Sequence, residues 1–239
     1  HGIIARLEGI PVLSTGILAF LVFFGAFAEP DEKEFEKAPL LARLRMLAAG
    51  SSTNLVTALL AVLLLTGLFA PSTAGVLIQE VAPNSPAEIA GLQQWDVIKA
   101  INGTPILNLQ NYSDFMSKVK PNTTLNVTVL HANQEENRTI KTAADPTNSS
   151  QAILGLIGGY NYLPNTLGLD QYTGIHLFWA LFWIHLLGIS VAIFNMLPAF
   201  PFDGERVLYY PLASLVKKRK RELRLTLNIL AWGLFLLNY

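Results

Sequence analysis

Residues 46–70 read MLAAGSSTNLVTALLAVLLLTGLFA, and no charged residue occurs between Arg45 and Glu80. A helix rises by about 1.5 Å per residue, so twenty-five residues exceed the roughly 30 Å hydrocarbon core of a bilayer. This stretch therefore predicts a transmembrane helix. A second uncharged stretch, residues 171–202, is also long enough to cross a membrane.

The composition of the whole chain agrees with this prediction. Of the 239 residues, 51% are hydrophobic and 14% are charged, whereas about 25% are charged in a typical soluble domain. Acidic and basic residues balance at 17 each, which argues against a nucleic-acid-binding protein. The sequence contains no cysteine, which excludes disulfides, thiol catalysis and cysteine-based metal sites. We expect a multi-pass α-helical membrane protein.

Two further apolar stretches are shorter or less regular. Residues 225–239 predict a spanning helix that is cut short. Residues 10–28 carry Pro11, Gly16 and Gly25 and are rich in Val, Phe and Ile, which favours strands. We interpret them as a membrane-associated β-hairpin that packs on protein or lines a cavity, because exposed strand edges are costly in lipid. A third full span is the alternative.

The positions of Lys and Arg predict the orientation in the membrane. Seven occur between Arg206 and Arg224, and five more lie between Arg6 and Arg45. Both clusters flank predicted spans, so the positive-inside rule places both in the cytoplasm if the hairpin does not cross. Residues 71–170 are then exoplasmic, and six Asn-x-Ser/Thr sequons there agree with that side.

About a hundred residues separate the two long apolar stretches, enough for one small domain. Their pattern predicts strands at 76–81, 97–101 and 125–130, and helices at 86–90 and 112–118.

The start of this domain, GVLIQEVAPNSPAEIAGLQQWDVIKAINGTPI, resembles a PDZ domain of the bacterial protease type through its SPA, AGL, DVI and ING segments. The resemblance covers roughly residues 75–160 and departs at Trp95, where the family has Gly. In the usual order the peptide-binding strand precedes GVLI, whereas here AILGLIGG at 152–159 is similar to that strand. The resemblance thus implies a circularly permuted α+β domain that binds an extended peptide along 153–156, through Gly155 and Leu156. The alternative is a strand that only closes the sheet.

The stretch Asn195-Met-Leu-Pro-Ala-Phe-Pro-Phe-Asp203-Gly ends the second apolar segment. An acidic residue there is a functional candidate, and the alternative is an interfacial or helix-capping Asp. Pro198 and Pro201 would break the helix and expose backbone, which is tolerated where a cavity or ligand satisfies it. The spacing N-x-x-P-x-x-x-x-D-G resembles the second signature of the site-2 protease family of intramembrane zinc metalloproteases.

The chain starts with HGIIARLEGIP, where His1 alone would be an ordinary helical residue. The pattern is similar to the segment that begins at the second histidine of His-Glu-x-x-His in the same family. The resemblance implies that His1 and Asp203 are ligands of a Zn²⁺ cofactor, with the first histidine and the general base Glu preceding His1. We expect the chain to be an internal fragment that is inactive alone.

The same resemblance assigns further segments. Gly50-x-x-x-Asn54 is similar to the family's small-residue motif, which lets helices approach closely. Asn195 would hold extended substrate backbone near the zinc. His185 lies eighteen residues before Asp203, or about 27 Å along a helix, so we expect a packed and hydrogen-bonded residue rather than a ligand.

We therefore divide the chain into three parts. Residues 1–70 hold the end of the zinc helix, the hairpin and a span; residues 71–165 form the exoplasmic PDZ-like domain; residues 166–239 hold a span with the Asp motif, a basic cytoplasmic loop and a truncated helix.

The predicted function is cleavage of transmembrane segments in single-pass, previously trimmed membrane proteins, which is regulated intramembrane proteolysis. The alternative is a non-catalytic, membrane-tethered PDZ scaffold for partner tails. The lack of repeated helical halves argues against a transporter.

Overall fold

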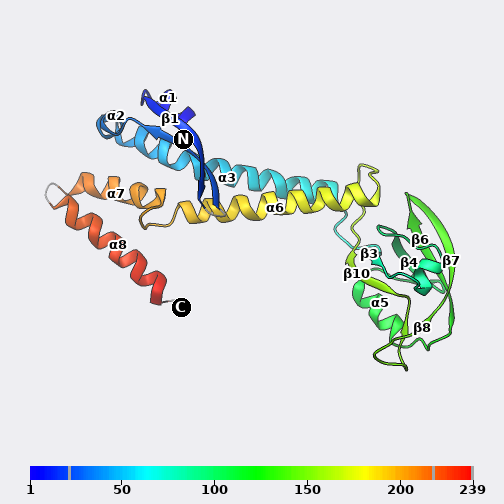
Figure 1. Ribbon diagram of the computed structural model, residues 1–239. Coiled ribbons are helices and arrows are strands. Elements are labelled where there is room, and N and C mark those ends of the chain that lie inside the picture. Colours follow the sequence, from blue (N-terminus) through cyan, green and yellow to red (C-terminus); the bar gives the residue numbers. More distant parts are fainter. Residues whose placement is uncertain (21–22, 217–218, 238–239) are drawn as a thin grey trace. The chain divides into compact units, whose positions relative to one another are not determined.

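The computed structural model describes residues 1–239 except 21–22, 217–218 and 238–239. It divides into two compact units. Unit 1 comprises His1–Ala61 and Trp183–Tyr239, and unit 2 is Val62–Phe182. Two long helices, α3 (Leu40–Leu68) and α6 (Gln171–Asn195), each contribute to both units (Figure 1).

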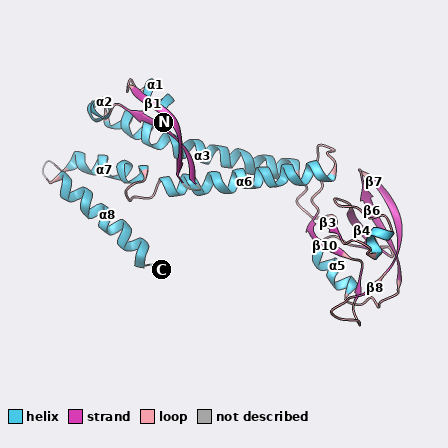
Figure 2. Ribbon diagram, viewed as in Figure 1, coloured by secondary structure: helices cyan, strands magenta, loops and turns pink. Residues whose placement is uncertain are grey.

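Outside α3 and α6, the described residues of unit 1 form a hairpin and four helices. They are α1 (Gly2–Leu7), β1 (Val12–Phe20), β2 (Phe23–Pro30), α2 (Glu32–Lys37), α7 (Asp203–Leu215) and α8 (Lys220–Leu237). The antiparallel pairing of β1 with β2 confirms the hairpin predicted for residues 10–28. Its tip, residues 21–22, lies outside the described residues. The prediction of a basic loop after Asp203 is wrong in part, because α7 and α8 place much of that segment in helices (Figure 2).

Within the described residues, α3 and α6 are the two helices that are long and apolar enough to cross a membrane. Most of their side chains are not buried by the rest of the chain, as expected of helices that face lipid. The predicted third span at 225–239 is not confirmed, since α8 begins earlier, at Lys220, and includes charged residues in its first turns.

Small residues bring α3 and α6 together in unit 1. A Cβ atom on Gly188 would lie 3.0 Å from the backbone oxygen of Asn54 and 3.1 Å from Cβ of Ala58. Nδ1 of His185 lies 3.0 Å from the Ala58 oxygen, so the ring donates a hydrogen bond between the helices. This confirms the prediction that His185 is a packed, hydrogen-bonded helix residue.

Unit 2 contains an antiparallel sheet with the strand order β10-β3-β4-β6-β7, and β5 pairs with β4. Its elements are β3 (Val76–Val81), α4 (Pro86–Ile89), β4 (Val97–Ile101), β5 (Thr104–Pro105), α5 (Leu109–Met116), β6 (Thr124–His131), β7 (Gln134–Lys141), β8 (Ala143–Ala144), β9 (Ala152–Ile153) and β10 (Leu156–Asn161). The strands predicted at 76–81 and 97–101 are confirmed to the residue. The single strand predicted at 152–159 is split by a break at 154–155.

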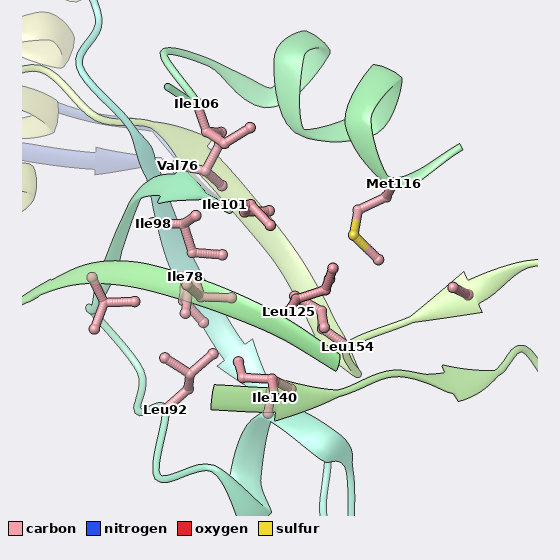
Figure 3. Close-up of a cluster of buried hydrophobic side chains, with 14 residues drawn as sticks. Val76, Ile78, Leu92, Ile98, Ile101, Ile106, Met116, Leu125, Ile140 and Leu154 are labelled. Carbon is pink, nitrogen blue, oxygen red and sulfur yellow. The ribbon is translucent and has the colours of Figure 1, made fainter. Parts of the chain in front are cut away.

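One hydrophobic core fills the domain (Figure 3). Leu125, Val127 and Val129 of β6 are buried and alternate with Thr124, Asn126 and Thr128, which are not. This period of two puts one face of the strand in the core and leaves the other exposed. Met116 from α5 and Leu154 from the loop between β9 and β10 reach the same core, which fixes that helix and loop against the sheet.

Candidate metal centre and peptide groove

His1 and Asp203 come from opposite ends of the sequence and meet in unit 1. His1 precedes α1, and Asp203 is the first residue of α7. Nε2 of the imidazole lies 3.4 Å from Oδ2 of the carboxylate, and the two side chains are 29% and 30% exposed. The structure thus places these two predicted ligands side by side, with both partly open to an approaching ion.

The other ring nitrogen of His1 determines which tautomer is present. Nδ1 lies 2.9 Å from the backbone oxygen of Met46 in α3. A carbonyl only accepts hydrogen bonds, so Nδ1 carries a proton, and in the neutral imidazole Nε2 then has its lone pair on the side of Asp203. A hydrogen bond of this kind is what orients a metal-ligating histidine.

Gly50, one turn beyond Met46, makes room for the ring. A Cβ atom at position 50 would lie 2.1 Å from Nε2 of His1, far inside van der Waals contact. Any side chain on Gly50 would therefore displace the imidazole from its present position. The small-residue motif predicted at Gly50 has a local cause here, which is the close approach of the histidine to the helix.

Two prolines and Gly204 determine the course of the loop before Asp203. Helix α6 ends at Asn195, and the amides of Met196 and Leu197 close its last turn by donating to Ile193 and Phe194. The predicted break of the helix near Pro198 is thereby confirmed.

Gly204 then lets the start of α7 return against the end of α6. A Cβ atom on Gly204 would lie 2.2 Å from the backbone oxygen of Met196, so the Asp-Gly pair fits where a larger residue would not.

The two side chains are of types that bind metal ions. Burial raises the pKa of the Asp203 carboxyl, and the nearby Arg206 opposes this shift. A histidine nitrogen with a free lone pair and a carboxylate are both common zinc ligands. Between them the described residues offer two ligands, and no cluster of three or more His, Asp or Glu residues is found in that part of the chain. The pair fits part of a zinc site.

A 610 Å³ cavity opens beside His1, between α1, the hairpin and α3. Val12, Thr15 and Ala28 of the hairpin line it together with Thr53 of α3. The hairpin thus lines a cavity next to the candidate metal ligand, as the sequence predicts. Asn195 ends α6 and its side chain is half-buried, and its predicted role in binding substrate stays a prediction.

A second candidate site lies in unit 2, where a 360 Å³ cavity runs between α5 and residues 151–156. Tyr112, Ser113 and Met116 line one side, and Gly155 and Leu156 line the other. The backbone of Gly155 has a φ of +85°, and a Cβ atom there would lie 2.2 Å from Cβ of Ser85. The two predicted peptide-binding residues therefore lie in a groove, beside the edge strand β10.

Two features of these regions were not predicted from sequence. Arg224 of α8 forms an ion pair with the buried Glu205, two residues after Asp203. In unit 2, Trp95 has a φ of +72°, and its ring packs on Tyr172 and His176 of α6 with centroids 5.5 Å apart. A tryptophan at a position that resembles a glycine of the PDZ family was a signal for such a contact.

The family model of Peptidase family M50 matches residues 1–238. An uncharacterized protein, MJ0971, of Methanocaldococcus jannaschii is 29% identical over 223 residues, which cover 93% of this chain and 55% of that protein. Zinc metalloprotease RasP of Shouchella clausii is 25% identical over 224 residues, which cover 75% of this chain and 53% of that protein.

Among solved structures, the PDZ domain of an SdrC-like protein from Listeria innocua is 26% identical, covers 37% of this chain and 99% of that one, and has a TM-score of 0.32. The chain spans about half the length of the curated relatives it matches.

Proposed function

This chain belongs to peptidase family M50, and we propose on that basis that it carries part of the active site of a multi-pass intramembrane zinc endopeptidase of the site-2 protease type. The observation that carries the proposal is the pair of His1 and Asp203, with Nε2 of the ring 3.4 Å from the carboxylate and Nδ1 hydrogen-bonded to the Met46 carbonyl. Two such groups are a common part of a catalytic zinc site, which takes three protein ligands and leaves one position for water.

We further propose that the third ligand and the general base come from a His-Glu-x-x segment directly before His1. Histidines at i and i+4 of one helix share a face, and the glutamate between them reaches a metal-bound water. On this proposal residues 1–239 alone do not cleave substrate. The same residues contribute His1 and Asp203 to the complete site.

The residues around the site then have defined tasks. Zinc, when bound, supplies Lewis-acid polarisation of the scissile carbonyl and an acidified water. The Met46 carbonyl holds the His1 ring in its metal-binding tautomer, and Gly204 holds Asp203 beside it. The hairpin lining the adjacent cavity and Asn195 would hydrogen-bond an unwound substrate, because a helical segment offers no free backbone for attack.

The substrates we propose are transmembrane segments of single-pass proteins that another protease has already trimmed. The groove between α5 and residues 151–156 would accept the trimmed end as an added strand along β10, on the exoplasmic side. The basic segment around α7 and α8 would be cytoplasmic.

A second candidate function, a membrane-tethered scaffold, is favoured by the groove in unit 2, since peptide binding there needs no metal. The two functions are separated by measuring zinc content and cleavage of a transmembrane reporter with the full-length protein. A protease should hold one zinc per chain, and D203N should lose both the zinc and the cleavage. A wild-type protein that holds no zinc yet binds peptide in the groove would be a scaffold.

A further inference from the structure

Glu205 is a buried carboxylate two residues after Asp203. It is 1% exposed, and it lies on the first turn of α7. Arg224 of α8 meets it with two parallel hydrogen bonds, from Nε to Oε1 at 2.6 Å and from Nη2 to Oε2 at 2.8 Å. A buried carboxylate needs such a partner, and the bidentate fork fixes direction as well as distance.

Asn228 lies one turn further along α8, on the same face. Its Oδ1 accepts a hydrogen bond from the backbone amide of Phe200 at 2.6 Å. Its Nδ2 donates to the backbone oxygen of Arg224 at 2.9 Å, which keeps the amide oriented. Phe200 is part of the loop between α6 and α7, three residues before Asp203.

The two contacts therefore lie on either side of Asp203 in the sequence. Arg224 fixes the chain two residues after it, and Asn228 fixes the chain three residues before it. Residues four apart on a helix lie on one face, so a single turn of α8 makes both contacts. Arg224 also lies over the ring of Tyr209 in α7, with its guanidinium carbon 5.4 Å from the ring centroid.

Stability alone is a poor explanation for this arrangement. An ion pair between a buried carboxylate and a partly exposed arginine adds little to stability, whereas its bidentate geometry constrains position strongly. A metal site needs its ligands held within a few tenths of an ångström. The loop around Asp203 contains two prolines and no regular secondary structure before α7, so it depends on contacts from outside to be held at that precision.

We infer that Arg224 and Asn228 are positioning residues that hold Asp203 in place as a zinc ligand. This inference rests on the proposed function. The two residues act through the loop and through Glu205, and they do not touch the metal themselves.

The test uses the full-length protein and the variants R224M, R224K and N228A. Zinc affinity is measured by competition with a chelator, ligand geometry by the visible absorption spectrum of the Co²⁺-substituted protein, and folding by thermal unfolding. The matched control is E222Q on the same helix, because the ion pair of Glu222 with Arg219, at 3.7 Å, is exposed to solvent.

R224M and N228A should weaken zinc binding roughly 10- to 100-fold, the usual effect of losing an outer-shell partner, and should alter the Co²⁺ spectrum. R224K keeps the charge without the fork and should fall between R224M and wild type. E222Q should match wild type in all three measurements.

The inference is overturned if R224M and N228A bind zinc as wild type does, with an unchanged spectrum, while D203N loses the metal. If D203N also keeps its zinc, the proposed metal site itself is wrong. R224M leaves a buried charge unpaired and can fail to fold. N228A leaves the Arg224–Glu205 pair in place and removes the hydrogen bonds of Asn228, including the 3.5 Å contact from its Nδ2 to Oε1 of Glu205, so it then decides the question alone.

Discussion

Replacing Gly50 by Ala should weaken zinc binding while leaving the helix at least as stable. The new Cβ atom would lie 2.1 Å from Nε2 of His1, whereas ordinary contact begins near 3.4 Å. The imidazole must therefore move by about 1.3 Å, several times the roughly 0.2 Å that a metal–ligand bond tolerates. A displacement of about 1 Å at a reacting centre typically costs on the order of 100-fold in activity, and we expect a loss of at least that size in zinc affinity.

Helix stability should change in the opposite direction. Alanine is better than glycine inside a helix by up to about 1 kcal/mol. The assay compares zinc affinity and thermal unfolding of G50A in the full-length protein, with G67A as the matched control on the same helix. A Cβ atom on Gly67 would have no neighbouring atom within 4 Å, so G67A should gain the helix contribution and keep its zinc. If G50A binds zinc as tightly as G67A does, His1 is not a ligand in this geometry.

Three further results are expected. W95G should stabilise the separately produced domain of residues 71–165 by about 1 kcal/mol, since glycine adopts a φ of +72° without strain. In the full chain, the same substitution should raise amide hydrogen exchange at the start of α6, because the ring contacts with Tyr172 and His176 are lost. Unchanged exchange would contradict this anchoring role. G155A should destabilise the domain of residues 71–165 in urea unfolding, because its Cβ would lie 2.2 Å from Cβ of Ser85. It should also abolish peptide binding measured by fluorescence anisotropy. A variant with wild-type stability would show that the loop geometry is wrong. Removing metal with a chelator should abolish reporter cleavage by the full-length protein, and added Zn²⁺ should restore it; cleavage that persists in metal-free protein would refute the zinc mechanism.

Patterns within short stretches of the sequence were enough to predict the two long helices and the hairpin. The uncharged stretches predicted α3 and α6, and the mixture of Gly, Pro and β-branched residues predicted the hairpin. Residues 206–224 were misjudged because a run of Lys and Arg carries information on membrane orientation and hides helical periodicity. Leu208, Leu212 and Leu215 were a helical signal in that segment.

Part of the candidate site could likewise be predicted from the sequence, and part could not. The spacing of Asn195 and Asp203 was readable because it resembles a family signature. Arg224 and Glu205 are nineteen residues apart, and nothing local says that α8 folds back on the start of α7. Trp95 was recognised only as a departure from the family, since its partners on α6 lie more than seventy residues away in sequence.

The structure gives a physical reason for the spacing of the Asp motif. Proline at 198 ends α6 soon after Asn195, and the backbone must then return within a few residues so that Asp203 faces His1. Gly204 permits that return because its missing side chain leaves room for the Met196 carbonyl. The motif thus encodes how the ligand arrives. What holds it there lies on α8, outside the motif, and so the motif alone cannot make a working ligand.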